Sequence, residues 1–254
     1  MVNSMKKLMV IAPHCDDEVL LCGATINKLV KSGNWKIFVV PCSYNEQAWS
    51  GEYNYDGNRK KVWAQLLASS KILHFQIVGN NKMISWPISV PGEDMSLEPN
   101  GHNMKFLIER IREVQPDVVI TCHPNCFHTD HRNVALAVRE AAYQAARKGI
   151  MGSEKSFKEP VVLWGEVDME GITEMKCMVT SEIREEDLEK KYEALKVYEG
   201  FVDNHPNQAS IFTEEHGRDW VFSLARLRGM HSGVKYAEVF EIANFKPMVK
   251  IEVF

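Results

Sequence analysis

The sequence lacks both long apolar runs and a strong excess of charge of one sign. Its longest apolar stretches, such as residues 8–13 and 37–41, are far shorter than the roughly 20 residues that cross a bilayer, and its N-terminus lacks the apolar core of a signal peptide. Thirty Lys and Arg stand against 34 Asp and Glu, for a formal net charge of -4, which argues against nucleic acid as a partner. We therefore expect a cytoplasmic protein with no transmembrane segment and no nucleic-acid partner.

The sequence also lacks the cysteine pattern of small secreted domains that are stabilised by disulfides. Six cysteines are scattered through 254 residues, and no secretory signal precedes them, so reduced thiols are expected. Cys122 and Cys126 have a spacing that zinc could use, but no second pair of cysteines completes a four-thiolate site. We therefore expect no structural zinc, and any bound metal ion would serve chemistry.

What the sequence does contain is a regular alternation of strand and helix patterns. Its length and its 45% of hydrophobic residues suffice for a core without disulfides. Apolar runs and helical spacing predict, in chain order, strand 7–13, helix 19–31, strand 35–42, helix 58–71, strand 74–78, helix 104–114, strand 117–122, helix 131–148, strands 161–167 and 175–180, and helices 185–198 and 220–227. This order predicts an α/β, Rossmann-like doubly wound fold, with a mostly parallel sheet and helices on both faces, in a single domain over residues 1–254.

The first cluster of reactive side chains lies at residues 13–18, Pro-His-Cys-Asp-Asp-Glu, where the first strand ends and the first helix begins. Three carboxylates within one turn repel one another, although a helix N-terminus offsets part of this repulsion. A bound cation would remove the conflict, so the cluster indicates a metal or catalytic site. The alternative is that Asp16 or Asp17 caps the helix while the other acids are solvated.

The second cluster lies at residues 123–131, directly after the strand at 117–122, and reads His-Pro-Asn-Cys-Phe-His-Thr-Asp-His. Neutral imidazole is a common zinc ligand, and a His-x-Asp-His pattern can supply a ligand, an acid or base, and a carboxylate that orients a ring. The alternative is that Asp130 caps the long helix that follows, with surface histidines beside it.

The expected topology brings these two clusters together. In the doubly wound strand order 3-2-1-4, the first and fourth strands are neighbours, and such sheets bind ligands in the crevice beyond the carboxyl ends of those strands. A dinucleotide is disfavoured there, because the first turn carries acids in place of G-x-G-x-x-G. The sequence has neither a P-loop nor a G-x-S-x-G nucleophile elbow. The hypothesis of a nucleotide-dependent enzyme would therefore be supported by the fold alone.

The paired motifs resemble those of the LmbE-like or PIG-L superfamily of metal-dependent de-N-acetylases. PHCDDE ends the first strand and HTDH follows the fourth, as in that family. The resemblance extends to EVLLCGATINKL in the first helix, to QPDVVITCHP around the fourth strand, and to RLRGMHSGVKYAEVFEI near the C-terminus. It implies the LmbE-like fold and covers most of the chain.

Position by position, the resemblance implies roles for seven residues. The three metal ligands would be His14, Asp17 and His131. Asp16 would be the general base, and a protonated His128 would meet the developing oxyanion or assist the leaving amine. Asp130 would tune His128, and Arg59 would bind substrate.

The implied activity is removal of an N-acetyl or similar N-acyl group from an amino sugar or small glycoconjugate by metal-activated water. Two histidines and a carboxylate leave a zinc ion open to water, although the same ligands also accept Fe²⁺ or another divalent metal. Cys15 and Thr129 replace usual family prolines, residues 42–44 depart from the family pattern, and Cys126 stands where some sugar deacetylases have tyrosine. These departures keep open the alternative of a catalytically inactive metal- or sugar-binding relative. The sequence is compatible with a monomer or a homo-oligomer.

Overall fold

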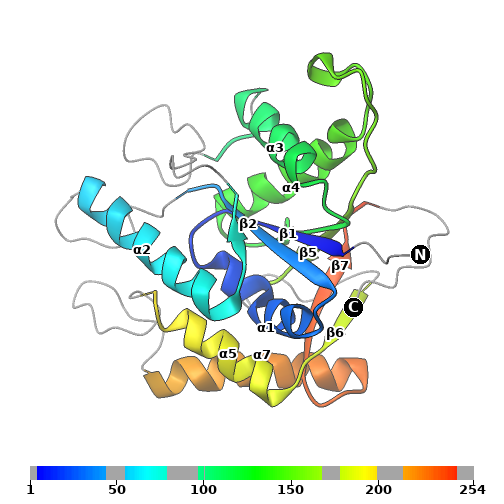
Figure 1. Ribbon diagram of the computed structural model, residues 1–254. Coiled ribbons are helices and arrows are strands. Elements are labelled where there is room, and N and C mark those ends of the chain that lie inside the picture. The colour runs from blue at the N-terminus through cyan, green and yellow to red at the C-terminus, as the bar shows by residue number, and fades with distance from the viewer. Residues whose placement is uncertain are drawn as a thin grey trace.

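The computed structural model describes residues 5–43, 55–78, 97–99, 101–167, 178–198 and 214–244. These residues form a seven-stranded sheet with the strand order β3-β2-β1-β4-β5-β7-β6 (Figure 1). The strands are β1 (Lys6–Ala12), β2 (Trp35–Pro41), β3 (Gln76–Ile77), β4 (Val118–Cys122), β5 (Val161–Gly165), β6 (Met178–Glu182) and β7 (Ala237–Ile242). The predicted order 3-2-1-4 is confirmed, and β1 pairs in parallel with both β2 and β4.

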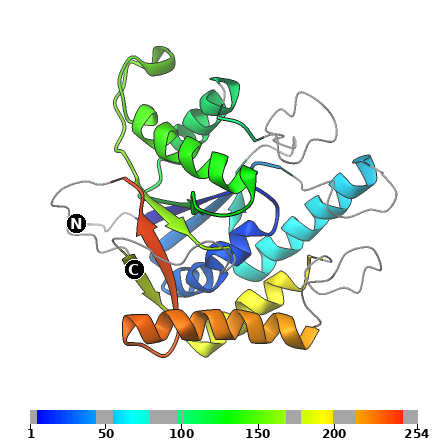
Figure 2. The same ribbon diagram turned by 180° about the vertical axis from the view of Figure 1, so that it is seen from behind.

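Helices cover both faces of this sheet, as predicted. They are α1 (Asp17–Lys31), α2 (Tyr55–Leu73), α3 (Gly101–Val114), α4 (Thr129–Ala145), α5 (Glu185–Leu195) and α7 (Glu214–Ser232), with a short 3₁₀ turn at Ile150–Gly152. Figures 1 and 2 show α3 and α4 on one face and the other four helices on the opposite face. Each face has its own apolar core, and the central strand β1 is buried from Leu8 to Ala12. Such a continuous apolar run is typical of a parallel strand covered on both sides.

The C-terminal part of the sheet differs from the expectation. Residues Ala237–Ile242 form β7, which the apolar pattern did not predict, and this strand runs antiparallel to both β5 and β6. This segment spans only six residues, Ala-Glu-Val-Phe-Glu-Ile, and does not alternate strictly between apolar and polar side chains, so periodicity alone does not separate a strand from an irregular segment. Helix α7 is also longer than the predicted range 220–227. None of the described helices is long and apolar enough to cross a membrane.

Helix α1 is broken one turn after it begins. Cys22 has φ -155° and ψ 28°, so the amides that follow it lose their usual partners within the helix. The Glu238 carboxylate from β7 accepts hydrogen bonds from Ala24 N and Thr25 N, at 3.3 and 2.7 Å, and Lys191 from α5 pairs with it at 2.8 Å. These contacts hold the start of the second segment of α1, and Lys191 Nζ also donates a hydrogen bond to Leu20 O in the first segment, at 2.7 Å.

Candidate metal and catalytic site

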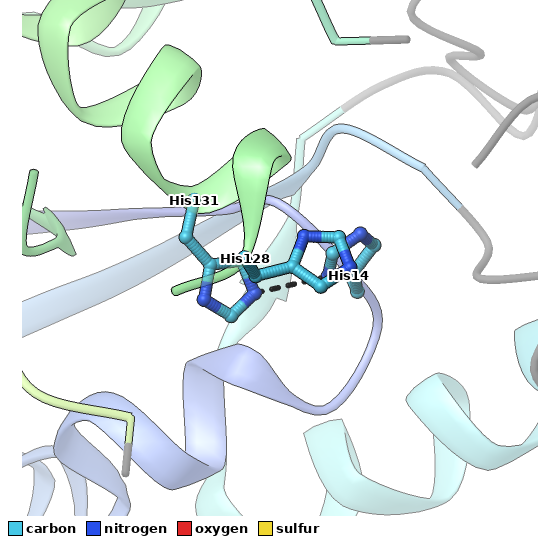
Figure 3. A group of neighbouring side chains, drawn as sticks. All are labelled: His14, His128 and His131. Atoms are coloured by element: carbon cyan, nitrogen blue, oxygen red, sulfur yellow. Dashed lines mark hydrogen bonds between the residues drawn. The ribbon is translucent and has the colours of Figure 1, made fainter. Parts of the chain in front are cut away.

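The two sequence clusters meet at the carboxyl ends of β1 and β4. These paired strands flank the point where the strand order reverses, which is where open α/β sheets bind ligands. His14 lies in the loop after β1, whereas His128 and His131 lie at the start of α4, and Figure 3 shows the three rings close together. His14 Nδ1 and His131 Nε2 are 3.1 Å apart although the residues are 117 positions apart in the chain. The structure therefore brings the predicted residues of both clusters into one site.

Three ligand atoms in this site form a nearly regular triangle. His14 Nδ1 lies 3.1 Å from His131 Nε2 and 3.3 Å from Asp17 Oδ2, and the last two atoms are 3.2 Å apart. Ligands held at about 2.0–2.1 Å from a tetrahedral zinc ion are separated by about 3.3 Å. The donor set and its spacing therefore fit a divalent cation, bound by the three residues whose ligand role the resemblance implied.

The nitrogen of each ring that faces away from the triangle has its own partner. His14 Nε2 lies 3.1 Å from Asp130 Oδ2, and His131 Nδ1 lies 3.2 Å from Cys126 Sγ. Asp130 is fully buried, and its other carboxylate oxygen accepts a hydrogen bond from Leu97 N at 3.0 Å. Such partners fix the orientation and tautomer of a metal-binding histidine. The expectation linked Asp130 to His128, but the structure places its carboxylate on His14, so it orients a predicted metal ligand.

The buried histidine and carboxylate of the triangle shift each other's pKa values. Burial acts to lower the pKa of His14, but hydrogen bonds to Asp130 and Asp17 outweigh it and raise the pKa to about 9. Burial acts to raise the pKa of Asp17, but the charges of His131 and His14 and their hydrogen bonds hold it well below its usual range. Imidazolium protons beside Asp17 would therefore compete with a cation for the ligand atoms.

Metal binding should consequently depend on pH. Burial acts to lower the pKa of His131, but the charge of Asp17 outweighs it and raises that pKa well above its usual value. Between about pH 6.5 and 8.5 an ion must therefore displace protons from both His14 and His131, and we expect the apparent association constant to rise at least about tenfold and up to about a hundredfold per pH unit. The sign follows from the raised pKa values, because alkali removes the competing protons. Chelator-buffered titration with Co²⁺ at several pH values measures this slope. An affinity that is independent of pH over this range would contradict the proton assignment.

His128 begins α4 as its N-cap residue. Its Nδ1 accepts a hydrogen bond from the backbone N–H of Asp130 at 3.2 Å, so the alternative that Asp130 caps this helix is wrong. Burial and the nearby charges of His14 and His131 lower the pKa of His128 to about 4. The expectation of a protonated His128 is therefore corrected: near pH 7 the ring is neutral. Because Nδ1 is an acceptor, the proton of the neutral ring lies on Nε2, which remains a donor.

Asp16 stands between the predicted ligands and has a strained backbone. It occupies the N-cap position of α1 with φ 153°, and its side chain makes no capping hydrogen bond. The alternative that Asp16 serves as a helix cap is therefore wrong. Burial and the charge of Asp17 raise the pKa of Asp16 well above its usual range. Strained, desolvated carboxylates of this kind are concentrated at functional sites.

Glu18 is a site residue for which the sequence analysis predicts no individual role. Its carboxylate is fully buried and accepts hydrogen bonds from Tyr198 Oη at 2.6 Å, Ser69 Oγ at 3.0 Å and the backbone N–H of Asp16 at 3.1 Å. Burial raises its pKa to about 7. Glu18 therefore ties the strained backbone of Asp16 to α2 and to the end of α5. Two of its partners are 51 and 180 positions away, so no local sequence signal reveals the network.

Two adjacent serines in α2 test this network. Ser69→Ala should lower the free energy of unfolding by about 1–3 kcal/mol, because the buried Glu18 carboxylate loses a donor. Ser70→Ala is the matched control, since Ser70 is half-buried and its hydroxyl donates to Leu67 O of its own helix, and its effect should stay within about 0.5 kcal/mol. Urea denaturation of both variants measures the difference. Equal stabilities would contradict the contribution of Ser69.

Arg59 and the cysteines are the other residues that the sequence analysis considered. Arg59 falls in the range of α2, but its side chain lies outside the described residues, so its predicted role in substrate binding stays a prediction. The five cysteines within the described residues are buried thiols that form no disulfide with one another. Cys15 packs beside the site and donates to Ser43 O at 3.4 Å.

The family model of PIG-L, described as GlcNAc-PI de-N-acetylase, matches residues 9–142. This range contains both clusters and more than half of the chain. The chain belongs to the PIG-L family. The resemblance is thus confirmed, and the PIG-L protein is an amide-hydrolysing enzyme of the de-N-acetylase type. No curated protein sequence matches it.

Solved structures share the fold of this PIG-L protein at low identity. GalB, the 4-carboxy-2-hydroxymuconate hydratase from Pseudomonas putida KT2440, is 19% identical with a TM-score of 0.71, over 97% of this chain and 100% of that one. N,N'-diacetylchitobiose deacetylase from Pyrococcus horikoshii is 20% identical with a TM-score of 0.70, over 96% and 88%. The zinc inhibited form of teicoplanin deacetylase Orf2 is 19% identical with a TM-score of 0.59, over 92% and 97%. At such identities these structures support the LmbE-like α/β fold alone.

Proposed function

We propose that this PIG-L protein is a zinc-dependent N-deacetylase that acts on an amino sugar or a small glycoconjugate. The observation that supports it most directly is the triangle of His14 Nδ1, Asp17 Oδ2 and His131 Nε2, whose edges of 3.1–3.3 Å suit one divalent ion. The ion would act as a Lewis acid and lower the pKa of a water molecule. Fe²⁺ or another divalent metal fits the same ligands.

In the proposed reaction, Asp16 transfers the proton and His128 stabilises the developing negative charge. Asp16 accepts a proton from the attacking water while the water oxygen bonds to the acyl carbon. His128 donates a hydrogen bond from Nε2 to the carbonyl oxygen as negative charge develops there. As the carbon–nitrogen bond breaks, the proton held by Asp16 passes to the amine nitrogen, and acetate and a free amine leave.

The surrounding contacts hold these groups in position. Asp130 and Cys126 orient the rings of His14 and His131, and Glu18 holds the backbone of Asp16. We further propose that Arg59 binds the substrate. The proposed substrate class is supported by the named activities of two structural neighbours, which are deacetylases of N,N'-diacetylchitobiose and of teicoplanin.

The test is acetate release from N-acetylglucosamine and N,N'-diacetylchitobiose by the metal-free and zinc-loaded protein. We expect turnover with one equivalent of zinc and its loss after chelation. Acetate release should also be measured with excess zinc, because one structural neighbour is a zinc inhibited form of a deacetylase.

Three outcomes contradict the proposal. Acetate release that survives complete metal removal would exclude a metal-dependent reaction. Glycan binding without hydrolysis across a broad panel of amides would favour an inactive binding relative. Hydration of 4-carboxy-2-hydroxymuconate without acetate release would favour the activity named for GalB, which has the same fold.

A further inference from the structure

A second metal-binding combination lies beside the proposed one and includes a thiol. Cys122, the last residue of β4, is fully buried. Its Sγ, a carboxylate oxygen of Asp17 and a ring nitrogen of His131 all lie within 4.8 Å of one another. All three residues are buried. The set shares Asp17 and His131 with the triangle and replaces the His14 nitrogen by sulfur.

The other thiol near His131 is placed differently. Cys126 Sγ lies against Nδ1 of His131, at 3.2 Å, whereas Asp17 Oδ2 lies against Nε2. The two nitrogens of an imidazole ring point in different directions, so Cys126 does not share an ion with Nε2 and Asp17. Cys122, by contrast, lies in one group of ligand atoms with Asp17 and His131.

Sulfur changes which ions the set prefers. Thiolate is a soft ligand that favours thiophilic ions such as Cd²⁺ and Zn²⁺ over Mg²⁺ or Mn²⁺. When an ion binds, a metal–sulfur bond forms and the thiol proton is released to solvent.

We propose that Asp17, Cys122 and His131 form a second cation-binding mode that is selective for thiophilic divalent ions and excludes the proposed catalytic mode. The exclusion follows because both modes use the same two side chains. The inhibitory consequence rests on the proposed function, whereas the binding mode itself does not. A protein with this arrangement would discriminate among divalent ions by their affinity for sulfur.

The experiment is Cd²⁺ titration of the metal-free protein, followed by the near-ultraviolet charge-transfer absorption of a cadmium–thiolate bond. The wild type should gain this absorption, and so should the Cys126→Ser control, whose hydroxyl replaces the thiol as partner of His131 Nδ1. Cys122→Ser should lack it and should bind Cd²⁺ at least about tenfold more weakly, because a soft ligand is lost. Circular dichroism establishes that each variant is folded, and Cys122→Ala serves as a second variant if Cys122→Ser is not.

Two outcomes would overturn the second mode. One is cadmium binding by the wild type without thiolate absorption. The other is absorption that is lost in Cys126→Ser and kept in Cys122→Ser. Its failure is distinguishable from failure of the proposed function, because a deacetylase that binds Cd²⁺ without thiolate absorption refutes only the second mode. A protein that releases no acetate with any metal but shows the Cys122-dependent absorption refutes only the proposed activity.

Discussion

Asp16→Asn is expected to reduce turnover by about 10²–10⁴-fold, the range typical of a lost general base, while the bound metal is retained. The amide is nearly isosteric with the carboxylate but cannot accept a proton from water. Metal content should persist because Asp16 is not part of the triangle formed by His14, Asp17 and His131. The acid limb of the pH–rate profile, which reports protonation of the base, should also disappear. Steady-state acetate release and elemental analysis measure the two effects separately.

Asp117→Asn is the matched control for this substitution. Asp117 directly precedes β4, at the opposite end of the strand from the site, and pairs with Lys158 at 2.7 Å. Its amide variant removes one carboxylate without touching the site, so turnover should change little. Asp16→Asn with turnover close to that of the wild type would refute the assignment of Asp16 as base. Joint loss of turnover and metal would instead make Asp16 a ligand.

The parts of this site that the sequence predicts are those with a local signal. The acids after β1 and the histidines after β4 stand out in the chain, and a doubly wound order places those two strand ends side by side. The network of Glu18 with Ser69 and Tyr198 has no such signal, because its members lie in three separate helical regions. The placement of Asp130 on His14 required coordinates, since the family resemblance linked Asp130 to His128.

The strands of the sheet also differ in how clearly the local sequence predicts them. Strands β1 and β4 are continuous apolar runs that are buried throughout or nearly so, so the sequence predicts them. Strand β7 has four buried residues followed by two of intermediate exposure, and it runs antiparallel to its neighbours because it enters the sheet after α7, from the other direction. Its side chain Glu238 supports the broken helix α1. A segment that periodicity leaves ambiguous thus supplies the hydrogen-bond acceptor for α1 just beyond its break.

Replacing His131 by Ala should remove the bound metal altogether. His131 Nε2 forms two edges of the ligand triangle, at 3.1 Å from His14 and 3.2 Å from Asp17. Loss of a partner that merely orients a ligand costs about 10–100-fold in metal affinity, so loss of a ligand should cost more than about 100-fold. Turnover with stoichiometric metal should fall to background. Calorimetric titration of the metal-free variant with Zn²⁺ or Co²⁺ measures the affinity.

Two further variants should have metal affinities higher than that of His131→Ala. His123→Ala is the control, because His123 belongs to the same cluster but bonds to Glu241 at 3.2 Å rather than to the triangle, and its variant should keep the metal. Asp130→Asn should fall between the two, with affinity lower by about 10–100-fold, since it weakens the partner of His14 Nε2 without removing a ligand. The expected order of affinity is therefore His123→Ala, then Asp130→Asn, then His131→Ala. Retention of tight metal binding by His131→Ala, or its loss in His123→Ala alone, would place the ion elsewhere than on the triangle.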